Sequence, residues 1–366
     1  MSEFRSLKPS SPLAEVRGAE GGLLPAFETE EQLDEHLSRP SPELIEDLAR
    51  VEGDLLVLGV AGKMGPSLAR MARRAWHAAG QTRRRVIGVA RFSEPGSKDA
   101  LERHGVETIA CDLMDERQWQ ALPEAANVIY MAARKFGSAG NEPLTWAVNT
   151  YLPGRIAERF RKSRIVSFST GNVYPFVPVG SGGPTEDHPV GPVGEYAQSC
   201  LGRERMFQHF SAVYGTPGAI LRLNYAVEPR YGVLLDIARK VARGDPIDVT
   251  MGYVNVIWQG DANAVALRSL TVCASPPLIL NLTGPETLSV RQVAERFAQL
   301  MGRPAPAIVG TEAPTVLLND ASRCHKRFGL PRVSAEQVLR WVAHWVARGG
   351  RELNKPTKFQ VRDGRF

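Results

Sequence analysis

Short apolar runs alternate with longer stretches of helical period through the first two thirds of the chain. Continuous runs rich in Leu, Val and Ile occur at Asp54–Gly59, Arg85–Ala90, Asn127–Ala132 and Arg164–Ser169, and Met64–Ala79 has helical spacing. Runs without polar alternation are typical of strands buried on both faces of a sheet. The pattern therefore predicts an α/β fold, a doubly wound parallel sheet with helices on both faces.

The chain divides into four predicted parts. Residues 1–25 mix Pro, Ser, Gly and charge without a period, which predicts a mobile tail. Residues 26–52 form a helical extension, and residues 53–223 form the sheet domain. Residues 224–366 form a smaller, mostly helical lobe that closes over the carboxyl edge of the sheet, with parts of 255–283 returning to the sheet domain.

The pattern also predicts individual elements outside the sheet. In the extension, Pro40 and Pro42 separate two short helices, and Ser41 is placed to cap the second. In the lobe, helical period predicts helices over Leu234–Ala242, Val290–Met301 and Ala335–Ala347, with a further segment around Val254–Trp258.

Composition and charge narrow the classes of partner. The net charge is +6, but the arginines are spread along the chain, without the basic run and interleaved aromatics of a nucleic-acid-binding segment. An anionic small molecule, such as a phosphorylated cofactor, suits this charge better than nucleic acid.

Cysteine usage and hydropathy indicate the compartment. The four cysteines, Cys111, Cys200, Cys273 and Cys324, lie far apart and show no metal-binding spacing. No signal peptide or membrane-spanning apolar stretch is visible. We therefore expect a cytoplasmic protein without a metal site or membrane partner.

A glycine loop follows the first predicted strand and opens the first helix. Gly59, Gly62 and Gly65 have the spacing that permits a sharp turn, close approach of a pyrophosphate and tight packing of helix on strand. Lys63 and Met64 lie within the loop, where free N–H groups at the helix start face the anion. The loop therefore predicts a dinucleotide site and a Rossmann-type fold.

The choice between NAD and NADP depends on the end of the second strand. An acidic residue there would bind the ribose 2′-hydroxyl, but the chain has Arg91, which with Lys63 can bind a 2′-phosphate. We favour NADP, although both residues can also be solvated surface charges. Asp112 and Leu113 are placed to meet the adenine edge, and Asp112 can equally be a simple loop residue.

Tyr196 and Cys200 occupy the positions of a Tyr-x-x-x-Lys pair. Residues i and i+4 share one helical face, so such a pair points into one cleft, where the ammonium lowers the pKa of the phenol. Cys200 cannot supply that fixed charge.

From about residue 53 to residue 347 the chain resembles the extended short-chain dehydrogenase/reductase family of nucleotide-sugar epimerases and dehydratases. The motifs that carry the resemblance are the Gly59/Gly62/Gly65 spacing, Asp112-Leu113, Met131-Ala132-Ala133, Asn149, Ser167–Tyr174, Glu186–Pro189, Tyr196, Leu221–Asn224, Pro229-Arg230, Gly284–Val290 and the Asp320–Gly329 stretch.

The resemblance implies roles for individual residues. Tyr196 is the expected acid/base, and Thr170 is the hydroxyl expected to hydrogen-bond the reacting oxygen. Asn149 is expected to align the helix that carries the active site. The residues expected to contact the cofactor are Gly59, Gly62, Lys63, Met64, Gly65, Arg91, Asp112, Leu113, Met131, Ala132, Ala133, Lys135, Tyr196 and Asn224. Those expected to bind substrate are Asn172, Arg222, Arg230 and Trp258.

The departures from the family pattern leave alternatives open. Lys135 resembles a cofactor-contacting lysine of UDP-galactose 4-epimerases, so its ammonium can replace the missing one, or it can be a solvated loop residue. Cys200 can be an activated thiolate, but a buried inert residue is the favoured interpretation. The family's Asn is usually one residue after Asn224, where Tyr225 stands.

The predicted dinucleotide site and the missing lysine at Cys200 leave two candidate functions. The first is an NAD(P)-dependent oxidoreductase or epimerase acting on a carbonyl or secondary alcohol, with a sugar-like molecule as one candidate substrate and Tyr196 as acid/base. The alternative is a non-catalytic NAD(P)-binding sensor or partner-binding protein. Dehydration is disfavoured, because Gly171-Asn172 replaces the Asp-Glu pair of 4,6-dehydratases. By analogy with the family we expect a homodimer and a small-molecule substrate.

Overall fold

The computed structural model describes residues 24–355 and 357–365. The mobile tail predicted for residues 1–25 lies outside the described residues, except for its last two positions. Among the described residues, no helix is both long enough and apolar enough to cross a bilayer.

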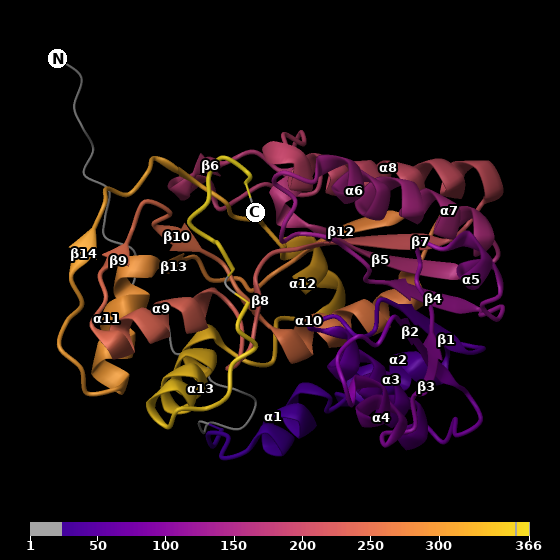
Figure 1. The fold of residues 1–366 in the computed structure, drawn as a ribbon, viewed down its shortest axis with the longest axis horizontal. Coiled ribbons are helices and arrows are strands. Elements are labelled where there is room, and N and C mark those ends of the chain that lie inside the picture. The colour runs from indigo at the N-terminus through magenta and orange to yellow at the C-terminus, as the bar shows by residue number, and fades with distance from the viewer. Residues whose placement is uncertain (1–23, 356, 366) are drawn as a thin grey trace.

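Seven parallel strands form the central sheet and confirm the predicted α/β class (Figure 1). In spatial order they are β12 (Leu278–Leu282), β7 (Gly218–Leu223), β5 (Arg164–Thr170), β4 (Asn127–Tyr130), β1 (Leu55–Leu58), β2 (Val86–Ala90) and β3 (Glu107–Ala110). The order reverses beside β1, which pairs with β2 on one side and β4 on the other. Ligands of doubly wound sheets bind at this switch point, beyond the carboxyl ends of the strands.

Helices cover both faces of the sheet, which explains why its inner strands lack polar alternation. On one face lie α2 (Pro42–Ala49), α3 (Gly65–Ala78), α4 (Ser97–Glu102), α10 (Gln259–Arg268) and α12 (Ser322–Phe328). On the other lie α5 (Glu116–Gln120), α7 (Leu152–Arg159) and α8 (Gly194–Tyr214), with α6 (Glu142–Trp146) and a π-helical turn (Ala147–Tyr151) packed against α8.

The C-terminal lobe has its own core, built mainly from three helices. These are α9 (Val233–Arg243), α11 (Val290–Leu300) and α13 (Ala335–Ala347). Two-residue strands complete the lobe and its junction with the sheet: β6 (Val177–Pro178), β8 (Ala226–Val227), β9 (Ile247–Asp248), β10 (Tyr253–Val254), β11 (Ile257–Trp258), β13 (Leu288–Ser289), β14 (Ile308–Val309) and β15 (Thr315–Val316). Short 3₁₀ turns lie at Gly171–Val173, Val179–Ser181 and Ser269–Val272. Within the 255–283 range, α10 packs on α3 and β12 pairs with β7.

The two helices of the N-terminal extension pack on different parts of the molecule. Helix α1 (Glu30–Leu37) buries Leu33 and Leu37 in the core of the lobe, whereas α2 packs beside α3. The hydroxyl of Ser41 accepts from the N–H of Leu44 at 3.2 Å, and Pro42 occupies the first turn, so the predicted cap is confirmed.

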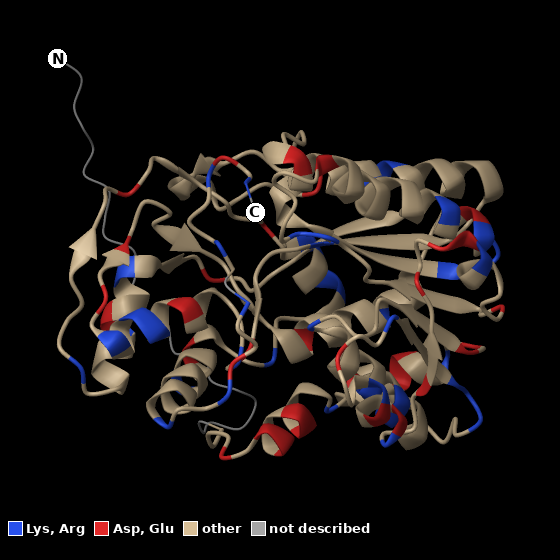
Figure 2. Ribbon diagram, in the orientation of Figure 1, with Lys and Arg blue, Asp and Glu red and all other residues tan. Residues whose placement is uncertain are grey.

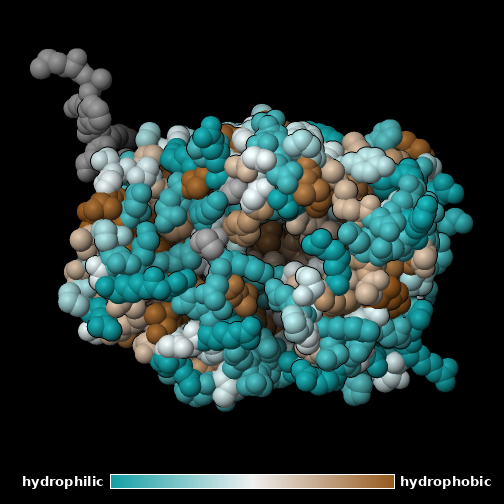
Figure 3. All heavy atoms as spheres, in the orientation of Figure 1, coloured by the Kyte–Doolittle hydropathy of each residue, from teal (hydrophilic) through white to brown (hydrophobic). Residues whose placement is uncertain are grey.

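Residues 351–365, here called the C-terminal segment, run from α13 back across the molecule toward α8 (Figure 1). Thr357 donates from its N–H and its hydroxyl to Asp236 of α9, at 3.0 and 2.6 Å. Val361 packs against the buried cluster that includes Tyr196 and Cys200 of α8. The segment therefore contacts both the lobe and the sheet domain, and Figure 3 shows an apolar recess near the centre of this face.

Acidic and basic side chains are interspersed over the face drawn in Figure 2. That distribution agrees with arginines spread along the sequence instead of gathered in one basic stripe.

Candidate dinucleotide and catalytic site

The glycine loop joins β1 to α3 and has no room for a side chain at Gly59 or Gly65. Gly59 has φ of +90°, and a Cβ there would lie 2.8 Å from the backbone nitrogen of Ala132. A Cβ on Gly65 would lie 2.1 Å from the carbonyl oxygen of Val60. Helix α3 begins after Met64 without a side-chain cap, so N–H groups of its first turn remain available to an anion. This cradle fits the pyrophosphate of a dinucleotide.

The side chain of Lys63 packs against β8 and the segment that follows it. Its ammonium donates to the carbonyl of Ala226 at 2.7 Å and lies 4.0 Å from the ring centroid of Tyr231. Burial lowers the pKa of Lys63 to about 7, against the opposing effect of Glu228. The expectation that Lys63 helps Arg91 at a 2′-phosphate is therefore corrected, because its side chain links the loop to β8.

Arg91, which the sequence predicts at the adenosine end of a bound dinucleotide, is exposed directly after β2. The carboxylate of Asp112 accepts from the N–H of Met114 at 3.0 Å, which closes a local turn, and Leu113 is buried. Met131 and Ala132 follow β4 half-buried, and Ala133 is exposed. These residues follow the carboxyl ends of β2, β3 and β4, and β2 and β4 are the two neighbours of β1.

Tyr196 lies in the first turn of α8, and its phenol faces Thr170 at the end of β5. The Thr170 hydroxyl and the Cys200 thiol both hydrogen-bond the phenol. Tyr196 is 9% exposed and Cys200 is fully buried. Burial raises the pKa of Tyr196 well above its ordinary value, Cys200 adds to this rise, and Arg203 opposes it.

The environment of Cys200 is that of an inert buried thiol. Burial raises its pKa, and the charges of Arg203 and Lys135 lower it only in part. Since burial raises the pKa of the thiol and so favours its neutral form, Cys200 hydrogen-bonds the phenol without providing charge.

Lys135 approaches Tyr196 from the loop after β4. Its ammonium lies 5.7 Å from the ring centroid of Tyr196 and donates to the carbonyl of Thr357 at 3.4 Å. Burial lowers the pKa of Lys135 to about 8. The residue therefore faces the cleft and is not a fully solvated loop lysine.

Asn149 joins this loop to α8 from within the π-helical turn. Its side chain accepts from the N–H of Arg134 and donates to the carbonyl of Arg134, both at 2.8 Å. It also donates to the hydroxyl of Ser199 at 3.0 Å, and that hydroxyl donates to the carbonyl of Tyr196 at 2.9 Å. Asn149 thus aligns the first turn of α8 with the loop that carries Lys135.

Arg222, expected to bind substrate, is instead part of a buried network. It is 3% exposed and pairs with Glu204 at 2.7 Å, while Nη1 donates to the hydroxyl of Tyr174 at 2.7 Å. Burial opposes the charge, but the hydrogen bonds and charge of Glu204 raise the pKa of Arg222. Its guanidinium therefore links β7 to α8 through Glu204.

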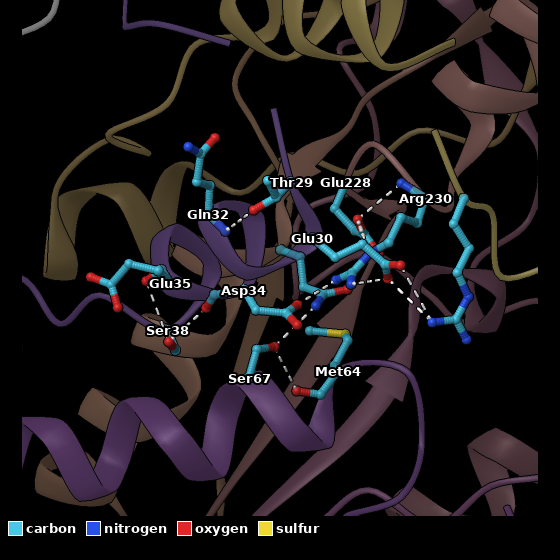
Figure 4. A network of polar contacts seen from close by, with 12 residues as sticks. Thr29, Glu30, Gln32, Asp34, Glu35, Ser38, Met64, Ser67, Glu228 and Arg230 are labelled. Carbon is cyan, nitrogen blue, oxygen red and sulfur yellow. Dashed lines mark hydrogen bonds and ion pairs between the residues drawn. The ribbon is translucent and has the colours of Figure 1, made fainter. Parts of the chain in front are cut away.

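Arg230, also expected to bind substrate, is held by three carboxylates (Figure 4). Glu228 lies beside it at 3.2 Å, and α1 contributes Asp34 at 2.8 Å and Glu30 at 3.4 Å. Arg230 therefore fastens the N-terminal helix to the segment after β8.

Three other expected site residues have protein partners. Trp258 is 2% exposed, in an aromatic cluster with Phe27, His36 and Trp341. The side-chain amide of Asn224 is buried and donates to Asn255 at 2.7 Å. Asn172 donates from its side chain to the hydroxyl of Thr170 at 2.9 Å and so remains at the edge of the site.

Sequence reasoning missed Arg203, Glu204 and the C-terminal segment. Arg203 and Glu204 are 3% and 0% exposed, although their residue types are usually on the surface. The available signal was spacing, because Cys200 and Glu204 follow Tyr196 at successive intervals of four on one helix.

A glycine loop at the switch point of a parallel sheet, with a tyrosine and a threonine meeting beyond the neighbouring strand, defines the short-chain dehydrogenase/reductase class. The chain belongs to the NAD dependent epimerase/dehydratase family, which it matches over residues 55–258.

Solved structures of the same class share its fold. MoeE5 in complex with UDP-glucose and NAD superposes with a TM-score of 0.67 at 22% identity, covering 81% of this chain and 99% of that one. A UDP-glucuronic acid 4-epimerase from Bacillus cereus, in complex with UDP-glucuronic acid and NAD, gives 0.67 at 18%, covering 81% and 99%. A dTDP-glucose 4,6-dehydratase from Bacillus anthracis with NAD gives 0.68 at 14%, covering 81% and 97%. No match was found among curated proteins.

Proposed function

We propose that the protein is an NAD(P)-dependent oxidoreductase or epimerase acting on a carbonyl or secondary alcohol of a nucleotide sugar. The observation that carries the proposal is the hydrogen bond between Tyr196 and Thr170 at the carboxyl edge of the sheet, the same edge that carries the glycine loop. The UDP-sugars in the similar structures support the substrate class, and their NAD supports a nicotinamide cofactor.

In the proposed reaction the protein supplies proton transfer and hydrogen bonding, through Tyr196 and Thr170. A bound nicotinamide would supply hydride exchange. Tyr196 transfers a proton between its hydroxyl and the substrate oxygen, and Thr170 donates a hydrogen bond to the same oxygen. Burial of Tyr196 favours its protonated form, which suits it to donate a proton.

The absence of a charge at Cys200 favours the second candidate, a dinucleotide-binding sensor without turnover. The two functions are separated by incubating the protein with NADH or NADPH and a panel of UDP-sugars and simple carbonyls. Oxidation of the reduced cofactor, or interconversion of sugar epimers, supports the enzyme. Tight cofactor binding with no conversion of any panel member would instead establish the sensor.

Arg91→Asp is expected to weaken NADPH binding at least about tenfold while NADH binding holds or tightens, because the exposed guanidinium at the end of β2 is placed for a 2′-phosphate. Calorimetric titration with each nucleotide measures this. Arg103→Asp, an exposed arginine after α4, controls for the change in net charge. Equal changes in affinity for NADPH and NADH would show that Arg91 does not contact the ribose 2′ position.

Lys135→Met is expected to weaken dinucleotide binding about tenfold at pH 7. Since the pKa of Lys135 is lowered to about 8, its ammonium is present below pH 8 and is lost as the pH rises through that value. The difference between the variant and the parent protein should therefore nearly disappear by about pH 9.5.

Cofactor titrations at several pH values measure this difference, with Lys162→Met, an exposed lysine between α7 and β5, as the control. If the Lys135→Met variant binds cofactor and turns over substrate like the parent protein at pH 7, Lys135 is not part of the site.

We also propose a cytoplasmic homodimer that pairs through the outer face of α6, the π-helical turn and α8. That face exposes Leu144, Tyr151 and Val213, with Tyr151 61% exposed. The four cysteines are free, which agrees with a reducing compartment. Light scattering of Tyr151→Lys against the parent protein tests the dimer.

A further inference from the structure

Arg203 is a buried cation whose hydrogen-bond partners in the described part of the chain are all neutral oxygen atoms. It is 3% exposed on α8, and among residues 24–355 and 357–365 no carboxylate forms an ion pair with it. The adjacent Glu204 is not available, because its two oxygens bind Arg222 and the hydroxyl of Ser169. The positive charge of Arg203 is therefore not cancelled locally.

The guanidinium lies between the elements that build the catalytic site. Nη1 donates to the carbonyl of Phe168 on β5 at 2.9 Å, and Nη2 donates to the side-chain oxygen of Asn149 at 3.0 Å. Arg203 follows Tyr196 by two helical turns, on the face of α8 that also carries Cys200. Arg203 and Tyr196 therefore lie on the same face of α8.

Hydrogen bonding alone does not account for a charge at this position. Burying a cation without a counter-ion is costly, whereas a neutral amide such as Gln can donate to carbonyl oxygens without that cost. Arg203 also lies 5.7 Å from the ring centroid of Tyr130, a fully buried residue near the same cluster. A buried guanidinium therefore lies against β5 and the π-helical turn, the elements that carry Thr170 and Asn149.

We propose that Arg203 is a positioning residue that supplies, through the protein interior, the fixed positive charge that Cys200 cannot provide to Tyr196. This inference rests on the proposed role of Tyr196 as acid/base. The single lysine of the family is then replaced by two residues: Lys135 faces the bound ligand, and Arg203 maintains a permanent charge below the phenol.

Two observations support this division. The charge of Arg203 lowers the pKa of Tyr196, Cys200 and Tyr130, acting in each case against burial. Through Asn149, Arg203 also shares a hydrogen-bond network with the loop that carries Lys135. An arginine side chain stays charged across the working pH range. Lys135, with its pKa lowered to about 8, loses its charge as the pH rises through that value.

The test measures the proton affinity of the phenol directly in the full-length protein, without substrate or cofactor. Tyr196 is replaced site-specifically by 3,5-difluorotyrosine, whose hydroxyl ionises within the pH range in which the protein is folded. Its absorbance is titrated with Arg203 present and in the variants Arg203→Gln, Arg203→Lys and Arg203→Gln/Cys200→Lys, and thermal unfolding confirms that each is folded.

Arg203→Gln is expected to raise the pKa of the probe by about 1, Arg203→Lys to leave it near the parent value, and the double variant to restore it. A probe pKa unchanged in folded Arg203→Gln, or raised equally in Arg203→Lys, overturns the inference and leaves Arg203 a structural tether. If Arg203→Gln does not fold, the double variant decides: a parental pKa supports the inference, and a raised pKa overturns it. Because the titration needs no turnover, its failure is distinguishable from a failure of the proposed function.

Discussion

Tyr196→Phe is expected to lower turnover about 10²- to 10⁴-fold, the usual contribution of a positioned acid/base, while changing cofactor affinity little. The substitution removes only the hydroxyl that bonds Thr170 and Cys200 and leaves the ring in its buried cluster. Steady-state rates on whichever substrate the panel identifies, with NADH or NADPH affinity measured in parallel, check this.

Tyr174→Phe is the matched control, because it removes a phenol from the same cluster. The hydroxyl of Tyr174 bonds Asn281 and Arg222 and has no proposed contact with substrate. Its loss should reduce stability and leave turnover within about threefold. If Tyr196→Phe retained parental turnover, the proton would have to come from another group and the proposed mechanism would be wrong.

Arg222→Met is expected to destabilise the protein by about 3–5 kcal/mol, since it leaves the carboxylate of Glu204 buried without its partner. Urea unfolding measures the loss. The double substitution Arg222→Met/Glu204→Leu should recover much of it, because removing both charges ends the uncompensated burial.

Arg85→Met, which breaks an exposed ion pair, is the comparison for the loss of stability in Arg222→Met. Arg85 pairs with Asp54 at 2.7 Å, but its side chain is 47% exposed, so we expect a loss below about 1 kcal/mol. Equal losses for Arg85→Met and Arg222→Met would show that the network around Glu204 does not stabilise the fold.

The elements that the sequence predicted correctly are those set by local physics. Apolar runs identify β1, β2, β4 and β5 because a strand covered on both faces must be apolar throughout. The positions of Gly59 and Gly65 follow from the turn and close packing that they alone permit. The Ser41 cap likewise needs only its immediate neighbours.

The sequence does not show which residues distant along the chain form ion pairs. For this reason the roles of three arginines were predicted wrongly or missed. The resemblance to the family implied that Arg222 and Arg230 contact substrate. Their carboxylate partners, Glu204 and Asp34, lie on other elements, and no local pattern indicates which charges will meet. Arg203 was overlooked for the same reason, since burial of a charged residue becomes evident only from the packed structure.

The C-terminal segment makes the two halves of the molecule thermodynamically dependent on each other. It is anchored to the lobe through Asp236, and its far end lies so close to α8 that a Cβ on Gly194 would come within 2.7 Å of Gly364. Separating the lobe from the sheet must also break these contacts. Both halves are therefore expected to melt in a single cooperative transition, with calorimetric and van't Hoff enthalpies in agreement.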